Sequence, residues 1–185
     1  MARRNTAATP LAVLVLGSGV LIAGSGLSLA ADDPCASFSW NVAHERTLFA
    51  AQPKSIKAGA QPSTAPVIAL DHPYELALTA QDQVHFGAEP GKKPRTEGAF
   101  AGLARIKVPT AGLYRISADQ PFWVDVVSGK EPIHSVDYQG APGCNAPHKV
   151  VQFLLPAGQQ LVVQISGLDI PHARITVTAA PAAGR

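Results

Sequence analysis

The amino-acid sequence predicts an all-β protein: an antiparallel β-sandwich, jelly-roll-like, with one short N-terminal helix. Two observations support this. Residues 102–127 contain three short runs in which apolar and polar residues alternate, separated by turn-forming residues around Pro109 and Pro121. Alternation with a period of two between such turns is typical of antiparallel strands with one buried face. Comparable runs recur at short intervals along the chain, as in sandwiches and barrels.

The central runs also predict which side chains face the core. The register that buries Tyr114 turns the other even-numbered residues of these runs inward as well. The predicted inward set is Ala104, Ile106, Val108, Tyr114, Ile116, Phe122, Val124 and Val126. The opposite set is Arg105, Lys107, Arg115, Ser117, Trp123 and Asp125. If consecutive runs pair as neighbours, this second set shares one polar surface.

In chain order, the first element expected is a helix over residues 41–50. Asn41 can cap its N-terminus and Glu45 lies in its first turn. We expect this helix to close an open end or an edge of the sheet. Residues 52–66 and 87–98 are rich in turn-forming residues and are predicted to be loops.

Further strands complete the predicted sandwich. They are expected at residues 66–70, 74–78, 83–86, 133–137, 149–155, 160–165 and 173–178, in addition to the central runs. This makes eight or nine short strands, and two sheets packed face to face bury the apolar side of each. A closed barrel is the alternative.

The N-terminal 30 residues have the features of a secretory signal peptide. Arg3 and Arg4 precede an apolar run over residues 11–23, and small residues surround a cleavage site after Ala30 or Ala31. The alternative is an uncleaved membrane anchor, but glycines interrupt the run and it is shorter than the roughly 20 residues that span a bilayer. We expect residues 31–185 to form a single periplasmic or secreted domain that does not contact the membrane after cleavage.

Charge argues against a nucleic-acid partner. The full chain has 15 Lys and Arg against 13 Asp and Glu, and cleavage would remove Arg3 and Arg4, leaving 13 of each sign. A neutral mature protein lacks the basic surface that binds phosphate backbones. The one basic cluster, residues 92–95, is most simply a solvated turn in a Gly- and Pro-containing loop.

The two cysteines, Cys35 and Cys144, are predicted to form a disulfide, because oxidation is the usual outcome in an exported protein. The alternative is a metal site formed by Cys144 and His148. Six histidines invite a wider search, but they are scattered singly along the chain. If a metal site exists, His134 and His148, which flank the Cys144 loop, are the first pair to consider. Loop or surface histidines are the simpler account.

No catalytic residue is marked by a local pattern. Residues 31–185 contain no G-x-S-x-G motif and no sequence-local Ser, His and acid set. We therefore expect no cofactor and favour binding over catalysis. The candidate ligand-binding residues are Trp123, Asp125, Arg115 and Arg105, because an indole among hydrogen-bonding charges can stack on a sugar or aromatic ring. Alternatively, the helix near Trp40 covers Trp123 and the charges form a cross-strand ion pair.

Two resemblances bear on function. The strand, Pro/Gly turn and strand patterns at residues 108–116 and 155–161 resemble jelly-roll carbohydrate-binding modules and pre-peptidase C-terminal domains. The chain also resembles a family of small exported bacterial proteins of unassigned function, at Cys35, residues 38–40, Glu45 and residues 91–94, 122–126 and 143–149. Some members of that family are labelled homogentisate dioxygenase, which implies an iron enzyme. This sequence has no H-x-H motif followed by Glu, the pattern expected of that ligand set.

Together these observations predict an exported binding or accessory protein. Its ligand is expected to be a carbohydrate or another small molecule. A small metalloenzyme, including the dioxygenase, is one alternative. An envelope protein that binds another protein through the sandwich surface is the other.

Overall fold

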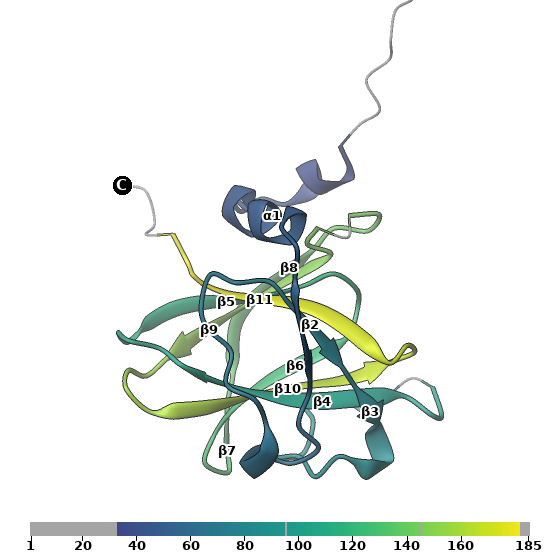
Figure 1. Ribbon diagram of the computed structural model, residues 1–185. Coiled ribbons are helices and arrows are strands. Elements are labelled where there is room, and N and C mark those ends of the chain that lie inside the picture. The colour runs from purple at the N-terminus through teal and green to yellow at the C-terminus, as the bar shows by residue number, and fades with distance from the viewer. Residues whose placement is uncertain (1–32, 95, 145, 182–185) are drawn as a thin grey trace, which may run out of the picture. The chain divides into compact units, whose positions relative to one another are not determined.

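The computed structural model describes residues 33–94, 96–144 and 146–181, which form two β-sheets (Figure 1). The six strands of one sheet are β1 (Lys54–Lys57), β2 (Tyr74–Ala77), β5 (Gly112–Ala118), β8 (Ser135–Gly140), β9 (Lys149–Leu155) and β11 (His172–Ala179). The five strands of the other are β3 (Thr79–Ala80), β4 (Phe100–Lys107), β6 (Trp123–Ser128), β7 (Glu131–Ile133) and β10 (Gln160–Leu168).

The strand order is that of a jelly roll. The six-stranded sheet runs β1-β2-β11-β5-β9-β8 and the five-stranded sheet runs β3-β4-β10-β6-β7. Within these, β2-β11-β5-β9 faces β4-β10-β6-β7, the arrangement of two four-stranded sheets joined by Greek-key connections. Neighbouring strands are antiparallel except β1 and β2, which are parallel. The predicted all-β sandwich is therefore confirmed, and the closed barrel is not what the chain forms.

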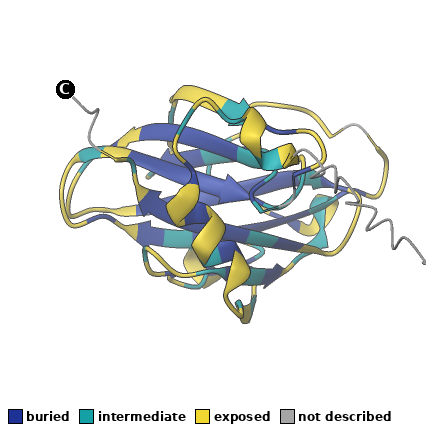
Figure 2. Cartoon of the chain, turned by 90° about the horizontal axis from the view of Figure 1, so that it is seen from above, coloured by how far each residue is buried: buried dark blue, intermediate teal, exposed yellow. Residues whose placement is uncertain are grey.

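The main core lies between the two sheets. All eight residues predicted to point inward from the central runs belong to it, from Ala104 to Val126. Figure 2 shows the consequence, with buried residues concentrated along the strands and exposed residues along the loops and helical turns. The alternation of side chains along a strand is thus a sufficient guide to the buried face here.

A second apolar cluster covers the outer face of the five-stranded sheet. It contains Ala65, Val84, Ala101, Leu103, Val127 and Val162, with Phe86 and Ala88 packed against it. The connecting segments around residues 58–99 supply half of this cluster. These segments therefore cover part of the outer face of this sheet.

Three local predictions were wrong. Residues 66–70 are not a strand, and only an isolated bridge joins Val67 to Arg105. Residues 83–86 are not a strand either: Gln83 ends the 3-10 turn η3 (Gln81–Gln83), and Val84 is buried in the second cluster without a strand partner. Conversely, β1 lies in a predicted loop. Its side chains are mostly exposed, so no alternation of apolar residues marked it.

The predicted helix exists as α1 (Ala43–Ala50). The predicted cap was wrong by one residue, because the N-cap is Val42, which makes no capping hydrogen bond through its side chain. The Asn41 side chain instead accepts a hydrogen bond from the backbone N–H of Ala43 at 3.0 Å, in the turn that leads into the helix. The helix contacts β11 on the outer face of the six-stranded sheet (Figure 1), so the expectation that it closes an end or an edge was wrong.

The predicted disulfide is present. Cys35, in the 3-10 turn η1 (Pro34–Ser37), is bonded to Cys144 in the connection between β8 and β9. The bond attaches the segment leading into α1 to the sandwich. None of the helices in the described part of the chain is long and apolar enough to span a membrane. The predicted signal peptide, residues 1–30, lies outside the described residues.

Candidate functional site

Trp123 begins β6 on the outer face of the five-stranded sheet. It lies opposite Ser166 of β10, and Asp125 lies opposite Gln164. The indole is half-buried, and its Nε1–H donates a hydrogen bond to Asp125 Oδ1 at 2.8 Å. Residues two apart on a strand share a face, so this contact follows from the predicted register. The structure therefore brings these two candidate residues together.

The loop after Phe86 is held against the edge of this indole. The backbone N–H of Gly91 donates to Asp125 Oδ2 at 3.1 Å. The approach is so close that a Cβ at position 91 would lie 2.9 Å from Trp123 Nε1. Gln164 fixes the start of the loop, because its buried side-chain oxygen accepts from Gly87 N at 2.6 Å and its amide donates to the carbonyl of Ala88 at 3.1 Å.

Between this loop and the sheet lies a cleft of about 380 Å³. Aromatic and charged side chains dominate its wall. The lining residues are Lys92, Lys93, Pro94, Pro121, Phe122, Trp123, Tyr138, Lys149, Ser166, Gly167 and Asp169. Tyr138 comes from β8 of the other sheet and is 68% exposed. The cleft thus joins two accessible aromatic rings from the two layers of the sandwich.

Two lysine ammonium groups lie near the Trp123 ring. Lys149 Nζ is 5.2 Å from the ring centroid and Lys92 Nζ is 5.7 Å from it. Lys149 Nζ also lies 6.0 Å from the Tyr138 ring and donates to the carbonyl of Phe122 at 3.1 Å. Such cation–π contacts are worth roughly 0.5–1 kcal/mol at exposed sites.

Burial lowers the pKa of Lys149 from its ordinary value. The nearby ammonium of Lys92 lowers this pKa further, and the carboxylate of Asp125 opposes the shift. A lowered lysine pKa means that the surroundings disfavour the positive charge. The cleft therefore holds an ammonium group that a bound anion would stabilise.

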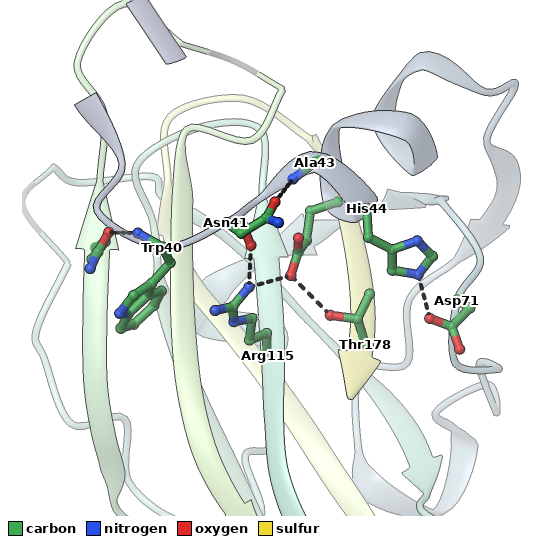
Figure 3. A network of polar contacts seen from close by, with 9 residues as sticks. Trp40, Asn41, Ala43, His44, Asp71, Arg115 and Thr178 are labelled. Carbon is green, nitrogen blue, oxygen red and sulfur yellow. Dashed lines mark hydrogen bonds and ion pairs between the residues drawn. The ribbon is translucent and has the colours of Figure 1, made fainter. Parts of the chain in front are cut away.

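Arg115 is not part of this cleft. It lies on β5 in the other sheet, beneath α1, where it is 5% exposed. Its Nη1 donates to Glu45 Oε1 at 3.1 Å and to the carbonyl of Asn41 at 2.8 Å, and its guanidinium stacks over the Trp40 ring at 5.1 Å. Figure 3 shows this network, in which Thr178 also donates to Glu45 Oε1. Its contacts make Arg115 a residue that holds α1 on the sheet.

Arg105 also lies away from Trp123. It faces Val162 of β10, four residues along that strand from the partner of Trp123, a separation of roughly 13 Å along the strand direction. Its Nε donates to the carbonyl of Ala65 at 2.7 Å and its Nη1 to Gln160 Oε1 at 3.3 Å. Arg105 therefore holds the segment before β2 against the sheet.

The prediction that the central runs pair as consecutive neighbours was wrong. For this reason Arg105 and Arg115 do not lie beside Trp123 and Asp125. β10 lies between β4 and β6, while β5 belongs to the other sheet. The alternative in which the helix near Trp40 covers Trp123 is not observed either. Trp40 contacts Arg115, and the loop containing Gly91 contacts Trp123 instead.

His134 and His148 do not converge. They precede Ser135 and Lys149, and β8 and β9 are antiparallel, with Ser135 opposite Phe153 and Gly140 opposite Lys149. The two histidines thus lie at opposite ends of this ladder, roughly 20 Å apart. Nδ1 of His148 contacts the carbonyl of Cys144 at 3.1 Å, and Cys144 is in the disulfide. Among the described residues, no group of three or more His, Cys, Asp or Glu is placed to hold a metal.

A larger cleft of about 560 Å³ lies on the other side of the Lys92–Pro94 segment. Its charged lining is mixed, with Asp82, Glu89 and Glu97 beside the lysines. Its one aromatic residue among those described, Phe86, packs against the second apolar cluster. The smaller cleft is therefore the better candidate, because it presents both an indole and a phenol ring.

Four residues of the cleft were not predicted from the sequence: Lys92, Lys93, Tyr138 and Lys149. The lysine pair was interpreted as a solvated turn, and nothing local to Tyr138 or Lys149 marks them. Only the pairing of β8 with β9 and the docking of the loop bring them to Trp123.

Comparison with models of protein families, with curated proteins and with solved structures finds no match.

Proposed function

We propose that the protein is an exported binding protein that holds a carbohydrate, or another small ligand with a ring, in the Trp123 cleft. The observation that carries this proposal is the cleft itself, in which the rings of Trp123 and Tyr138 lie beside hydrogen-bonding groups. Pyranose rings bind through their apolar faces to aromatic side chains while polar groups orient the hydroxyls.

One feature of the structure and one of the sequence are consistent with export. The Cys35–Cys144 disulfide suits an oxidising compartment. The N-terminal segment, which lies outside the described residues, has the sequence features of a secretory signal. The resemblance of the strand and turn patterns to carbohydrate-binding modules, together with the jelly-roll order of the strands, supports the same proposal.

A glycan array tests this function. Wild type should bind a defined set of glycans, and Trp123→Ala and Tyr138→Ala should each weaken that binding. Val136→Ala is the matched control, because Val136 is on the same strand as Tyr138 and is 56% exposed but does not line the cleft. Circular dichroism should show the same fold for all four proteins. Equal binding by wild type and Trp123→Ala on every glycan contradicts the proposal.

A second candidate, docking to an envelope protein, is favoured by strand β8. This strand lies at the edge of its sheet and is exposed along almost its whole length, and among the described residues its strand partner is β9 alone. Val136 and Leu154 expose apolar side chains there. Exposed edges accept an added strand from a partner. Under this alternative, Val136→Lys abolishes partner capture while Trp123→Ala leaves it unchanged.

The iron-enzyme alternative requires a ligand set such as two histidines and a carboxylate on facing elements. No observation among the described residues favours it. Metal analysis of the purified protein tests it directly, and a stoichiometric iron content would replace the binding proposal with this one.

A further inference from the structure

The lining of the Trp123 cleft carries more positive than negative side chains. Three lysines line it, Lys92, Lys93 and Lys149, against a single carboxylate, Asp169. This excess of positive charge stands out because the chain from residue 31 onward is neutral, with 13 residues of each sign. The local excess is therefore a feature of how the fold arranges its charges.

The nearby carboxylates are already engaged by other donors. Asp169 Oδ1 accepts a hydrogen bond from the Thr96 hydroxyl at 2.6 Å. Asp125 accepts from Trp123 Nε1 and from the backbone N–H of Gly91. None of the three lysines takes part in an ion pair with another described residue. No described carboxylate therefore lies within 4.0 Å of their ammonium groups.

Lys149 is held in the cleft by weak contacts and has no anionic partner there among the described residues. Its ammonium group is partly removed from water, and its contacts are one carbonyl and two aromatic rings. A charge-assisted bond to an anionic oxygen is stronger than these contacts. Lys92 and Lys93 lie on the loop across the cleft, and their long side chains can turn toward the same anion.

We propose, resting on the function proposed above, that the ligand is an anionic carbohydrate. The indole of Trp123 packs against the sugar ring, and the ammonium groups of Lys149, Lys92 and Lys93 bind a carboxylate or sulfate group carried by that ring. Neutral sugars satisfy the aromatic half of this site and leave its cationic half unpaired.

The effect of pH follows from the groups around Lys149. These are the ammonium of Lys92, the carboxylate of Asp125 and the phenol of Tyr138. Burial and Lys92 lower the pKa of Lys149, and a bound anion opposes both effects by stabilising the charged form. The contribution of Lys149 to binding an anion is therefore fully present below its pKa and is lost as the pH rises through it.

Matched ligands test the proposal. Oligogalacturonate is compared with its methyl ester, and a sulfated galactan oligosaccharide with its desulfated form, by isothermal titration calorimetry at low salt. At least one anionic member should bind on the order of tenfold or more tightly than its neutral partner, the factor expected for one charge-assisted contact. The preference should shrink as NaCl is added. The two pairs distinguish a carboxylate from a sulfate.

Single substitutions test which lysines are responsible for the preference for an anionic ligand. Lys149→Gln and Lys92→Gln should each remove most of the preference for the anion. Lys107→Gln is the matched control, since Lys107 is exposed at the end of β4 and does not line the cleft. An equal loss in Lys107→Gln indicates diffuse attraction and overturns the proposal.

The outcomes also separate this proposal from the one on which it rests. If acidic and neutral members of each pair bind equally and both depend on Trp123, the carbohydrate site stands and its preference for anions is wrong. If no member of either pair binds and the glycan array is also blank, both proposals fail. If none binds but the array shows neutral glycans, only the preference for anions fails.

Discussion

Removing the carboxylate of Glu45 should destabilise the protein strongly, because this carboxylate is the counter-ion of a buried arginine. Glu45 Oε1 accepts from Arg115 Nη1 at 3.1 Å and from the Thr178 hydroxyl at 3.2 Å. The side chains of Glu45 and Arg115 are 2% and 6% exposed. In Glu45→Ala, the guanidinium keeps only the Asn41 carbonyl and the Trp40 ring as partners (Figure 3).

The expected cost is large compared with that of an ordinary surface substitution. Breaking a buried ion pair by removing one partner costs about 3–5 kcal/mol. For a domain of this size each kcal/mol lowers the melting temperature by about 2–4 °C, so Glu45→Ala should melt roughly 6–20 °C below wild type. Replacing both Glu45 and Arg115 by Met removes the unpaired charge and should recover much of this loss.

Differential scanning calorimetry measures the effect, with the neighbouring Arg46→Ala as the control. Arg46 pairs with Asp33 at 2.7 Å on the surface, where water and salt screen the interaction, so its loss should barely change the melting temperature. A melting temperature for Glu45→Ala within about 2 °C of wild type, the shift that less than 1 kcal/mol produces, would refute the reasoning.

Three further predictions concern the disulfide, the loop and a carboxyl group. Replacing Cys35 and Cys144 by Ser opens a loop of 109 residues and should lower the free energy of unfolding in urea by about 4–5 kcal/mol in the chain-entropy model. Gly91→Ala places a Cβ 2.9 Å from Trp123 Nε1, so the loop must shift, and both urea stability and glycan affinity should fall. Burial raises the pKa of Asp119, whose carboxylate accepts a hydrogen bond from Arg174 N at 3.0 Å. The protonated carboxyl therefore contributes to the free energy of unfolding in full below about pH 3.9, and this contribution is lost as the pH rises through the raised pKa. The melting temperature of Asp119→Asn minus that of wild type should therefore increase from pH 3.5 to 7.

Each of these has a control or a contrary outcome. Gly112→Ala should be tolerated, because a Cβ there meets no atom within 4 Å. If Gly91→Ala matches Gly112→Ala in both assays, the loop is not docked on Trp123 as described. Equal unfolding free energies with and without reductant would contradict the stabilising role of the disulfide. A constant difference in melting temperature across pH would contradict the raised pKa of Asp119.

The sequence was a good guide to which side chains of the central runs face the main core. It was not a guide to burial on the opposite face, where Arg115 and Ser117 are buried as well. Tyr114, Ile116 and Val126 lie in the core because alternation is a property of a single strand and needs no knowledge of its partners. The same logic put Trp123 and Asp125 on one outer face, where they hydrogen-bond. For these residues, local pattern and tertiary structure agree.

Strand pairing was not predictable in the same way. Arg115 looked like a neighbour of Trp123 because their strands are consecutive in the chain, but β5 and β6 belong to different sheets. The partners that do reach Trp123 come from distant segments, Lys92 by a loop and Lys149 by β9. Such contacts depend on long-range topology, which the periodicity of a single segment does not contain.

The most direct test of the binding site follows the two indole N–H signals in a ¹H–¹⁵N spectrum while oligogalacturonate or the sulfated galactan oligosaccharide is added. The chain has two tryptophans, and the spectrum of Trp123→Ala assigns both signals. If the cleft binds the glycan, the Trp123 signal should move in a saturable manner, while that of Trp40, which stacks on Arg115, stays in place. A Trp123 signal that is unchanged while the glycan binds, or a shift confined to Trp40, would contradict binding in the cleft.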